Sequence, residues 1–406
     1  MHILPILSTL RRHRTTATLI ILEIALTCAI VCNAIFLIRD RLSRIDLPTG
    51  LNESELVRIQ ITGIDKNASA AALTSQDLQS LRAIPGVRYA ACTNMLPFSS
   101  SSWTSSAHTE PGDRSTRFTA ATYMGTADLL ETWGVQLVAG RDFTPEEYVE
   151  FDALQSGQAK LGSVIITRQA ADRLLPGKNP LGQRLYVIGK DPQIVVGVID
   201  RLATSTEGQG MADRNHAMVF PVNVPYSVGG TYLLRVDPAR RAEVLAAIDA
   251  AIARVDHSRI VLSRQSFAEI RDDFFRQDRS LAYLLSGVSI ALLAVTGFGL
   301  VGLASFWVQQ RTRQIGVRRA LGATRGDIVR YFQLENFLLT TAGIAIGMAL
   351  AYAINLWLMH RYQIARLPAG FLPVGAGLLW LLGQIAVLGP ALRAATIPPS
   401  IATRSV

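Results

Sequence analysis

The sequence predicts a membrane protein with four transmembrane α-helices and a large extracytoplasmic mixed α/β domain between the first and second helices. Three observations support this fold class. Four apolar runs each reach the length of about 20 residues that a helix needs to cross a bilayer. The long region between the first two runs alternates strand and helix patterns. Arginine is concentrated in the short segments on one side of the apolar runs, as expected for cytoplasmic flanks.

Each element follows from its position relative to these runs. The first run is predicted to be a retained anchor, because Ala25, Leu26 and Thr27 make a poor lipoprotein cleavage site before Cys28. The predicted order is a cytoplasmic N-terminal segment with a weak amphipathic pattern (1–16), a transmembrane helix (17–38), an outer α/β domain with stalk helices (39–280), a second transmembrane helix (281–308), a cytoplasmic coupling loop or helix (309–331), a third transmembrane helix (332–359), a short outer loop (360–370), a fourth transmembrane helix (371–388) and a cytoplasmic tail (389–406).

The charge distribution orients the chain. The formal charge of +9 divides into −1 for residues 39–280 and +10 for the remaining segments. Eleven arginines flank the apolar runs on the side predicted to be cytoplasmic, whereas the short outer loop has only Arg361 and Arg366. This asymmetry places both termini inside and the α/β domain outside. The positive charge therefore reflects topology, and no nucleic-acid partner is predicted.

The outer region shows the alternating patterns of a folded α/β domain with its own core. Cys92 is the single cysteine of this region, since the chain's other two, Cys28 and Cys32, lie in the first apolar run, so no disulfide framework is predicted. The predicted strands are 56–62, 87–92, 118–124, 164–167, 183–188, 193–199, 232–236 and 260–263, and the predicted helices begin at Thr74, Asp128 and Pro238. The serine-rich stretch 97–108 is predicted to be an exposed, mobile loop, in which Trp103 either contacts a partner or is tucked against the domain.

The end of the outer region has a helical pattern that leads into the second apolar run. Phe267, Ile270 and Phe274 recur at spacings of three and four residues. No proline or glycine interrupts the pattern before Leu281, so the sequence predicts one unbroken helix. A stiff helix of this kind would carry movement from the membrane to the outer domain as a stalk.

The segment 309–331 is strongly basic and carries an apolar stripe. Its apolar residues Ile315, Val317, Leu321 and Ile328 recur at near-helical spacing, which predicts a short amphipathic helix. Its charged residues are Arg311, Arg313, Arg318, Arg319, Arg325 and Arg330 against the single acid Asp327. Charge alone is enough to set the topology. The apolar stripe and the glycines Gly316 and Gly322 are not needed for it, so the segment is interpreted as a docking helix for a cytoplasmic partner. Charge that serves topology alone is the other interpretation.

Two carboxylates and one glycine pair stand out inside the apolar runs. Glu23 and Glu335 lie near the inner ends of their helices, where each could extend to the interface or pair with a basic neighbour. Gly343 and Gly347 form a G-x-x-x-G pattern, which is typical of a close helix contact.

The sequence shows no catalytic motif. It contains no G-x-x-x-x-G-K-[ST] loop for ATP, no G-x-S-x-G motif and no metal-ligand spacing. No catalytic residue, cofactor or metal site is therefore predicted on this chain, and ATP with Mg²⁺ is expected on a partner. One alternative stays open, a membrane-anchored hydrolase built around Ser102 and His108.

The basic segment contains the pattern R-x-x-x-I-G-V-R-R-A-L-G-A, which resembles the coupling loop of MacB/FtsX-type permeases of ABC transporters. Gln314 departs from the pattern, because an acidic residue is usual there. The coupling-loop residues identified by this resemblance are Arg311, Arg313, Gln314, Ile315, Gly316, Arg318, Arg319, Leu321, Gly322 and Ala323. The segments 133–143, 166–185, 195–199 and 390–404 are also similar to this family.

The resemblance implies an assembly and a function. It implies a porter-like subdomain with a second subdomain inserted at very roughly 126–227, and a dimer of identical or related permeases in the bacterial inner membrane. It further implies a separate cytoplasmic ABC ATPase and, for export, a periplasmic adaptor with an outer-membrane channel. The expected function is a permease subunit that couples ATP hydrolysis to periplasmic movement for efflux. The alternative is an FtsX-like signalling subunit that regulates a periplasmic enzyme without transport.

Overall fold

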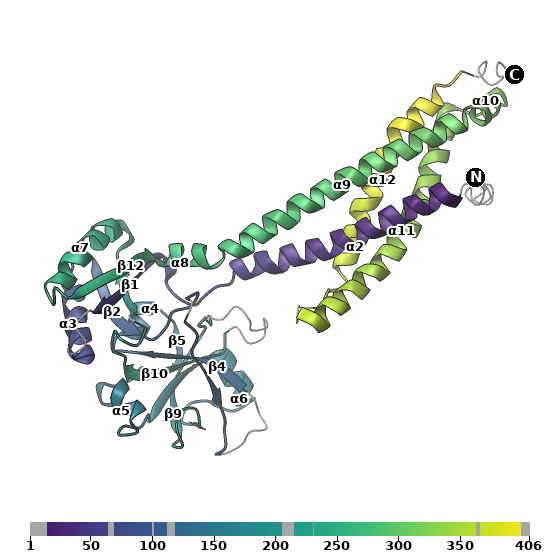
Figure 1. The fold of residues 1–406 in the computed structure, drawn as a ribbon. Helices are drawn as coiled ribbons and strands as arrows, with labels where there is room; N and C mark the ends of the chain where they lie inside the picture. Colours follow the sequence, from purple (N-terminus) through teal and green to yellow (C-terminus); the bar gives the residue numbers. More distant parts are fainter. Residues whose placement is uncertain are drawn as a thin grey trace. The chain divides into compact units, whose positions relative to one another are not determined.

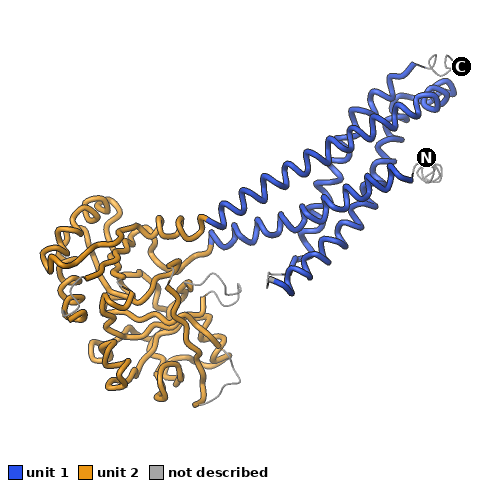
Figure 2. The backbone as a smooth tube through the Cα atoms, viewed as in Figure 1, with its two compact units in different colours: residues 1–46, 277–406 blue, residues 47–276 orange. Residues whose placement is uncertain are grey.

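A computed structural model describes residues 14–63, 69–99, 101–111, 118–204, 215–229, 231–362 and 366–398 (Figure 1). The chain divides into two compact units (Figure 2). Unit 1 comprises residues 1–46 and 277–406 and is helical, whereas unit 2 comprises residues 47–276 and contains the sheet. Of the N-terminal segment 1–16 with its predicted amphipathic pattern, residues 1–13 lie outside the described residues.

Unit 1 contains long helices that correspond to the four apolar runs. Within the described residues, four helices are long and apolar enough to cross a membrane. They are α2 (Arg14–Ile45), α9 (Arg276–Gln310), α11 (Arg325–Tyr362) and α12 (Phe371–Ala395), and the short helix α10 (Thr312–Ala320) lies between α9 and α11. Each long helix continues beyond its predicted span, because the backbone hydrogen-bonded ladder does not have to end where the apolar run ends.

The glycine pair on α11 makes the predicted close contact. A Cβ atom at Gly343 would lie 2.8 Å from Cβ of Ile24, and one at Gly347 would lie 2.5 Å from Cβ of Cys28. Both distances are too short for any side chain, so α2 and α11 approach each other through glycine. The prediction of a helix contact here is confirmed. Cys28 and Cys32 are buried packing residues in this bundle.

Unit 2 is built on one twelve-stranded sheet among the described residues. The strand order is β12-β1-β11-β2-β4-β10-β7-β9-β5, with β3 on β4, β6 on β10 and β8 on β9. The strands are β1 (Leu56–Gly63), β2 (Val87–Thr93), β3 (Thr104–Ala107), β4 (Phe118–Gly125), β5 (Leu137–Gly140), β6 (Val149–Glu150), β7 (Ser163–Thr167), β8 (Arg184–Leu185), β9 (Gln193–Ile199), β10 (Ala217–Asn223), β11 (Thr231–Val236) and β12 (Arg259–Ser266).

Short helices connect and cover these strands. The α-helices are α3 (Ala70–Arg82), α4 (Leu129–Trp133), α5 (Phe151–Gln155), α6 (Arg168–Leu174), α7 (Arg241–Ala253) and α8 (Phe267–Phe274), and the 3₁₀ helices are η1 (Glu53–Glu55), η2 (Pro145–Glu147) and η4 (Pro238–Arg240). The first predicted helix begins at Ala70 rather than at Thr74. Ser69 caps it by accepting from the Ala72 N–H, while Thr74 is buried inside the helix and donates to the Ala70 carbonyl.

The sheet serves two hydrophobic cores. The first core packs β1, β2 and β11 against α3 and α7, and includes Leu81 and Ile248. The second core packs β4, β7, β9 and β10, and includes Ile166 and Phe220. The two halves of the sheet are joined at the single residue pair Thr93 and Gly125 between β2 and β4. The inserted subdomain expected from the sequence begins at about residue 126. The second core also includes Ala107, which precedes that position, because β3 pairs with β4.

The predicted unbroken stalk helix is wrong. Helix α8 ends at Phe274, Phe275 has φ −90° and ψ 7°, and α9 begins at Arg276. Adjacent residues of a regular helix point about 100° apart. The turn lets Phe274 and Phe275 both contact the Phe98 ring, with centroids 5.2 and 5.0 Å away. Aromatic packing at this position therefore outweighs helix continuity.

Candidate coupling site

Helix α10 is a separate helix because both of its ends are specified. It begins after Arg311, whose backbone is non-helical, and it ends at Ala320, with Leu321 as its C-cap. Gly322 follows with φ +97°, a left-handed conformation that glycine adopts without strain. Thr324 and Asp327 then cap α11 reciprocally, since each backbone N–H donates to the other side chain at 3.0 and 3.2 Å. These turns place α10 between two membrane helices.

One face of α10 is buried. Ile315 is 4% exposed, and Gly316 is also buried. Ile315 belongs to a hydrophobic cluster with Ile328 and Phe332 of α11 and with Val387 of α12. This packing holds α10 against the inner ends of α11 and α12.

The opposite face of α10 is exposed and combines positive charge with apolar surface. Val317 and Leu321 are 48% and 83% exposed. The coupling-loop residues on this face are Arg313, Gln314, Arg318 and Gly322, together with Val317 and Leu321. Arg319 and Ala323 are partly exposed, and Arg319 donates to the Ile397 carbonyl. We call the six exposed residues the docking face. Such a surface suits an acidic groove with an apolar floor.

Arg311 lies inside the bundle rather than on the docking face. Its side chain is 6% exposed, and that of Glu335 on α11 is 1% exposed. Nη1 of Arg311 donates to both carboxylate oxygens of Glu335, at 2.9 and 2.8 Å. The guanidinium also lies 5.3 Å from the centroid of the Trp307 ring. The pair therefore ties the junction of α9 and α10 to α11, and Glu335 pairs with a basic residue, one of its two expected arrangements.

A small cavity lies beside this pair. It has a volume of about 20 Å³, and Trp307, Phe332, Glu335 and Asn336 are among its lining residues. The indole Nε1 of Trp307 and the amide Nδ2 of Asn336 are buried without a hydrogen-bond partner in the part of the chain that the structure describes. This volume is enough for one water molecule, which needs polar partners of this kind. The junction of α9 and α10 therefore has buried polar groups among helix surfaces that are otherwise apolar.

Comparison with known families identifies the chain. The family described as MacB-like periplasmic core domain matches residues 18–251, which is more than half of the chain. The chain belongs to this family of MacB-type permeases. The family described as FtsX-like permease C-terminal matches residues 286–399, which include α10. The MacB-type assignment thus covers the outer domain, and the FtsX-like match covers the candidate coupling site.

Relatives of this MacB-type permease carry export names. The chain is 29% identical over 227 residues to a probable syringafactin export ATP-binding/permease protein of Pseudomonas syringae, covering 54% of this chain and 32% of the relative. It is 24% identical over 238 residues to the macrolide export ATP-binding/permease protein MacB of Chromobacterium violaceum, covering 56% and 34%. The match thus spans about a third of the length of these relatives.

Solved structures give matches over the outer domain. The periplasmic region of MacB from Actinobacillus actinomycetemcomitans matches with a TM-score of 0.33 and 14% identity, covering 55% of this chain and 94% of that one. The extracellular domain of the transporter YknZ matches with a TM-score of 0.31 and 17% identity, covering 51% and 100%.

The predicted stalk residues of this MacB-type permease lie within unit 2. Phe267 is fully buried, Ile270 is 4% exposed and Phe274 is half-buried. All three belong to α8, and Phe267 and Phe274 contact Phe98. Phe98 is not among the predicted stalk residues, although it lies near the start of the serine-rich stretch that the sequence marks as distinctive. Trp103 is tucked against Phe151, with ring centroids 6.2 Å apart.

The serine-rich stretch does not form the histidine arrangement of a serine hydrolase in the described residues. Nδ1 of His108 is buried, and no described residue forms a hydrogen bond with it. An acid bonded to this nitrogen would orient the ring in such a site. Ser102 lies on the exposed part of the loop. Around His108, an open hollow is lined by Ser105, Ser106, Tyr186 and Lys190.

Proposed function

We propose that this chain is the permease subunit of an ABC exporter in the bacterial inner membrane, driven by a cytoplasmic ATPase on a partner subunit. ATP binding would close the ATPase domains against the docking face of α10, and the membrane helices would pass this movement to the periplasmic domain. One observation carries the proposal. The exposed face of α10 is both basic and apolar, and its buried face packs against the membrane helices α11 and α12.

Two contacts support force transmission through α10. Ile315 packs into the cluster with Phe332 and Val387, so a push on α10 reaches α11 and α12. The ion pair between Arg311 and Glu335 couples the start of α10 to α11. Close-packed interiors respond to strain by moving as units rather than by absorbing it.

Export is proposed from the names of the relatives, which describe export ATP-binding/permease proteins. A dimer of identical or related permeases, a periplasmic adaptor and an outer-membrane channel are proposed from the resemblance of the sequence to MacB/FtsX-type permeases. The FtsX-like alternative, in which the same movement regulates a periplasmic enzyme, uses the same docking face. Partners captured on the outer domain would separate the two, since export requires a channel and signalling requires an enzyme.

The decisive experiment changes the docking face and measures ATPase activity. The double variant Arg313→Glu with Leu321→Asp should lower stimulation of the partner ATPase in nanodiscs about tenfold, which corresponds to about 1.4 kcal/mol of lost interaction. Both side chains are exposed, so the thermal unfolding midpoint should stay unchanged. Arg361→Glu makes the same arginine-to-glutamate replacement at the other end of α11 and serves as the control. Undiminished stimulation in the double variant would refute the proposal.

A further inference from the structure

The chain passes between the two units twice, after Asp46 and after Arg276. On the unit 2 side, the incoming segment runs from Leu47 to η1, and the outgoing segment is α8. The ladder between β1 and β12 pairs these two parts of the chain, ending at Val57 and Ser266. Beyond this end of the ladder, side chains hold the segments together.

Arg271 on α8 makes most of these contacts. Its Nη1 donates to both carboxylate oxygens of Glu53, at 2.6 and 2.8 Å, and its Nη2 donates to the Leu47 carbonyl at 2.7 Å. The Arg271 and Glu53 side chains are 18% and 27% exposed. Charge-assisted contacts of this geometry are stronger and more specific than neutral hydrogen bonds. Arg271 therefore joins the outgoing helix to two points of the incoming segment.

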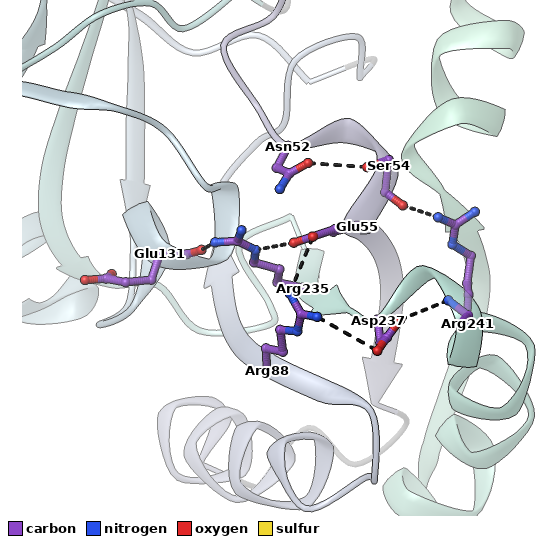
Figure 3. A network of polar contacts seen from close by, with 9 residues as sticks. Asn52, Ser54, Glu55, Arg88, Glu131, Arg235, Asp237 and Arg241 are labelled. Atoms are coloured by element: carbon purple, nitrogen blue, oxygen red, sulfur yellow. Dashed lines mark hydrogen bonds and ion pairs between the residues drawn. The ribbon is translucent and has the colours of Figure 1, made fainter.

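The incoming segment is in turn fixed to the sheet, as Figure 3 shows. Glu55 of η1 accepts from Nε of Arg235 on β11 at 2.6 Å and from Arg88 on β2 at 3.4 Å. Arg235 also donates to the Glu131 carbonyl on α4 at 3.0 Å, and Arg241 of α7 donates to the Ser54 carbonyl. Displacement of η1 would thus reach strands and helices around the first core.

Phe98 adds the serine-rich stretch to this arrangement. The Arg271 guanidinium lies 5.4 Å from the Phe98 ring centroid, and the ring contacts Phe267, Phe274 and Phe275. Phe98 has φ +63°, a left-handed conformation that bulky residues rarely adopt and that persists only where the surroundings enforce it. In the middle of the stretch, Trp103 packs on the second core through Phe151. The stretch therefore has one aromatic contact with α8, through Phe98, and one with the second core, through Trp103.

We infer that Arg271 is a positioning residue that makes the incoming segment, the outgoing helix and the Phe98 loop move together, so that movement of the membrane helices reaches both cores of the outer unit. We call Arg271, Glu53 and Phe98 the base clamp. In unit 1, Arg41 of α2 donates to Asp278 of α9, so the two helices that lead to the outer unit are bridged there as well. The inference rests on the proposed function, which supplies the movement.

The test uses the full chain with its ATPase in nanodiscs and two pairs of spin labels. The inner pair, at Ser305 and Thr341, reports on α9 and α11, and the outer pair, at Ala83 and Lys178, reports on the two cores. In the wild type, nucleotide should change both distances. Arg271→Met should keep the inner change and lose more than half of the outer change. The control is Arg276→Met, whose side chain is 75% exposed in an ion pair with Asp273, and it should keep both changes.

A second variant guards against a folding defect. Glu53→Gln keeps the size of the side chain and one acceptor oxygen but removes the charge and the second acceptor for Arg271, so the outer change should shrink with little change in the unfolding midpoint. If the wild type shows an inner and an outer change and both clamp variants keep the full outer change, the clamp inference is overturned. If the wild type shows no change in either pair, the proposed function fails, and the clamp inference fails with it.

Discussion

Among the described residues, each unit of this permease contains one arginine–carboxylate pair whose side chains are both almost fully buried, and the two pairs differ in their surroundings. In unit 2, the side chains of Arg259 and Asp77 are both 0% exposed. In unit 1, the side chains of Arg311 and Glu335 are 6% and 1% exposed. Both pairs bury charge, which costs free energy unless geometry and extra hydrogen bonds compensate.

The pair in unit 2 lies inside a compact core. Asp77 on α3 also accepts from the Tyr232 hydroxyl at 2.6 Å, and the Arg259 guanidinium lies 3.7 Å from the Tyr226 ring centroid. Burial raises the pKa of Asp77, although the hydrogen bond from Tyr232 and the charge of Arg259 act to lower it. Tyr232 and Arg259 therefore do not fully offset the cost of burying the Asp77 carboxylate. The elements that the ion pair joins, α3 and β12, are also held in place by the sheet and the first core.

The pair in unit 1 lies at a joint. Arg311 lies between α9 and α10, so its contact with Glu335 fixes the start of a short helix to α11. The comparison teaches that burial of an ion pair does not define its role. The role follows from what else joins the same elements, so the first pair should affect mainly stability and the second mainly coupling.

The largest expected effect is on unit 2. Asp77→Leu alone should lower the free energy of unfolding by about 3–5 kcal/mol, because Arg259 is left as a buried unpaired charge. The double variant Asp77→Leu with Arg259→Met should recover most of this loss. Chemical denaturation of the purified chain, followed by tryptophan fluorescence, measures both. A double variant as unstable as the single one would show that the pair is a net stabiliser of the core.

A smaller stability effect but a larger functional one is expected in unit 1. Glu335→Gln should lower the free energy of unfolding by about 2 kcal/mol, because Arg311 loses a charged acceptor. The double variant Arg311→Met with Glu335→Leu should regain stability but still fail to stimulate the partner ATPase. Stimulation assays on nanodiscs test this, with Arg361→Glu as the exposed control. Full stimulation in the double variant would assign the pair to stability alone and remove the contrast with unit 2.

The smallest effect concerns Asp142 of unit 2, an acid that forms no side-chain ion pair within the described residues. Burial, with smaller contributions from Glu131 and Asp128, raises the pKa of Asp142 from 3.8 to about 6, whereas Arg141 holds the pKa of the nearby Glu147 at about 2. Between pH 4 and 6 the folded state keeps a proton on Asp142 that the unfolded state releases. Stability should therefore fall as pH rises through this range, by about 1 kcal/mol given partial solvent contact.

Asp142→Asn should remove this dependence. The variant cannot ionise, so its unfolding midpoint at pH 7.5 should rise toward its value at pH 5, and thermal unfolding at the two pH values measures the difference. Glu147→Gln is the matched change at the arginine-paired acid and should instead lose stability at pH 7.5. An Asp142→Asn variant with the same pH dependence as the wild type would contradict the assignment.

Much of the architecture could be predicted from local sequence. The four apolar runs, the arginine flanks and the glycine pair at Gly343 and Gly347 are properties of short segments, and the structure contains the helices and the contact they predict. Strand β10 was missed because it is buried on both faces and lacks the alternation that marks a half-buried strand. The position of the coupling segment between two membrane helices followed from its flanks alone.

The sequence alone determined where the chain meets the membrane and where its charge lies, because hydrophobic length and local charge act over a few residues. Only the tertiary structure decided that Arg311 faces Glu335, that the stalk pattern is interrupted at Phe275, and that Arg271 joins Leu47 and Glu53. These outcomes depend on partners distant in the chain. A periodic pattern shows which face of a helix is buried, but the residues that meet that face are set by how the remaining elements pack.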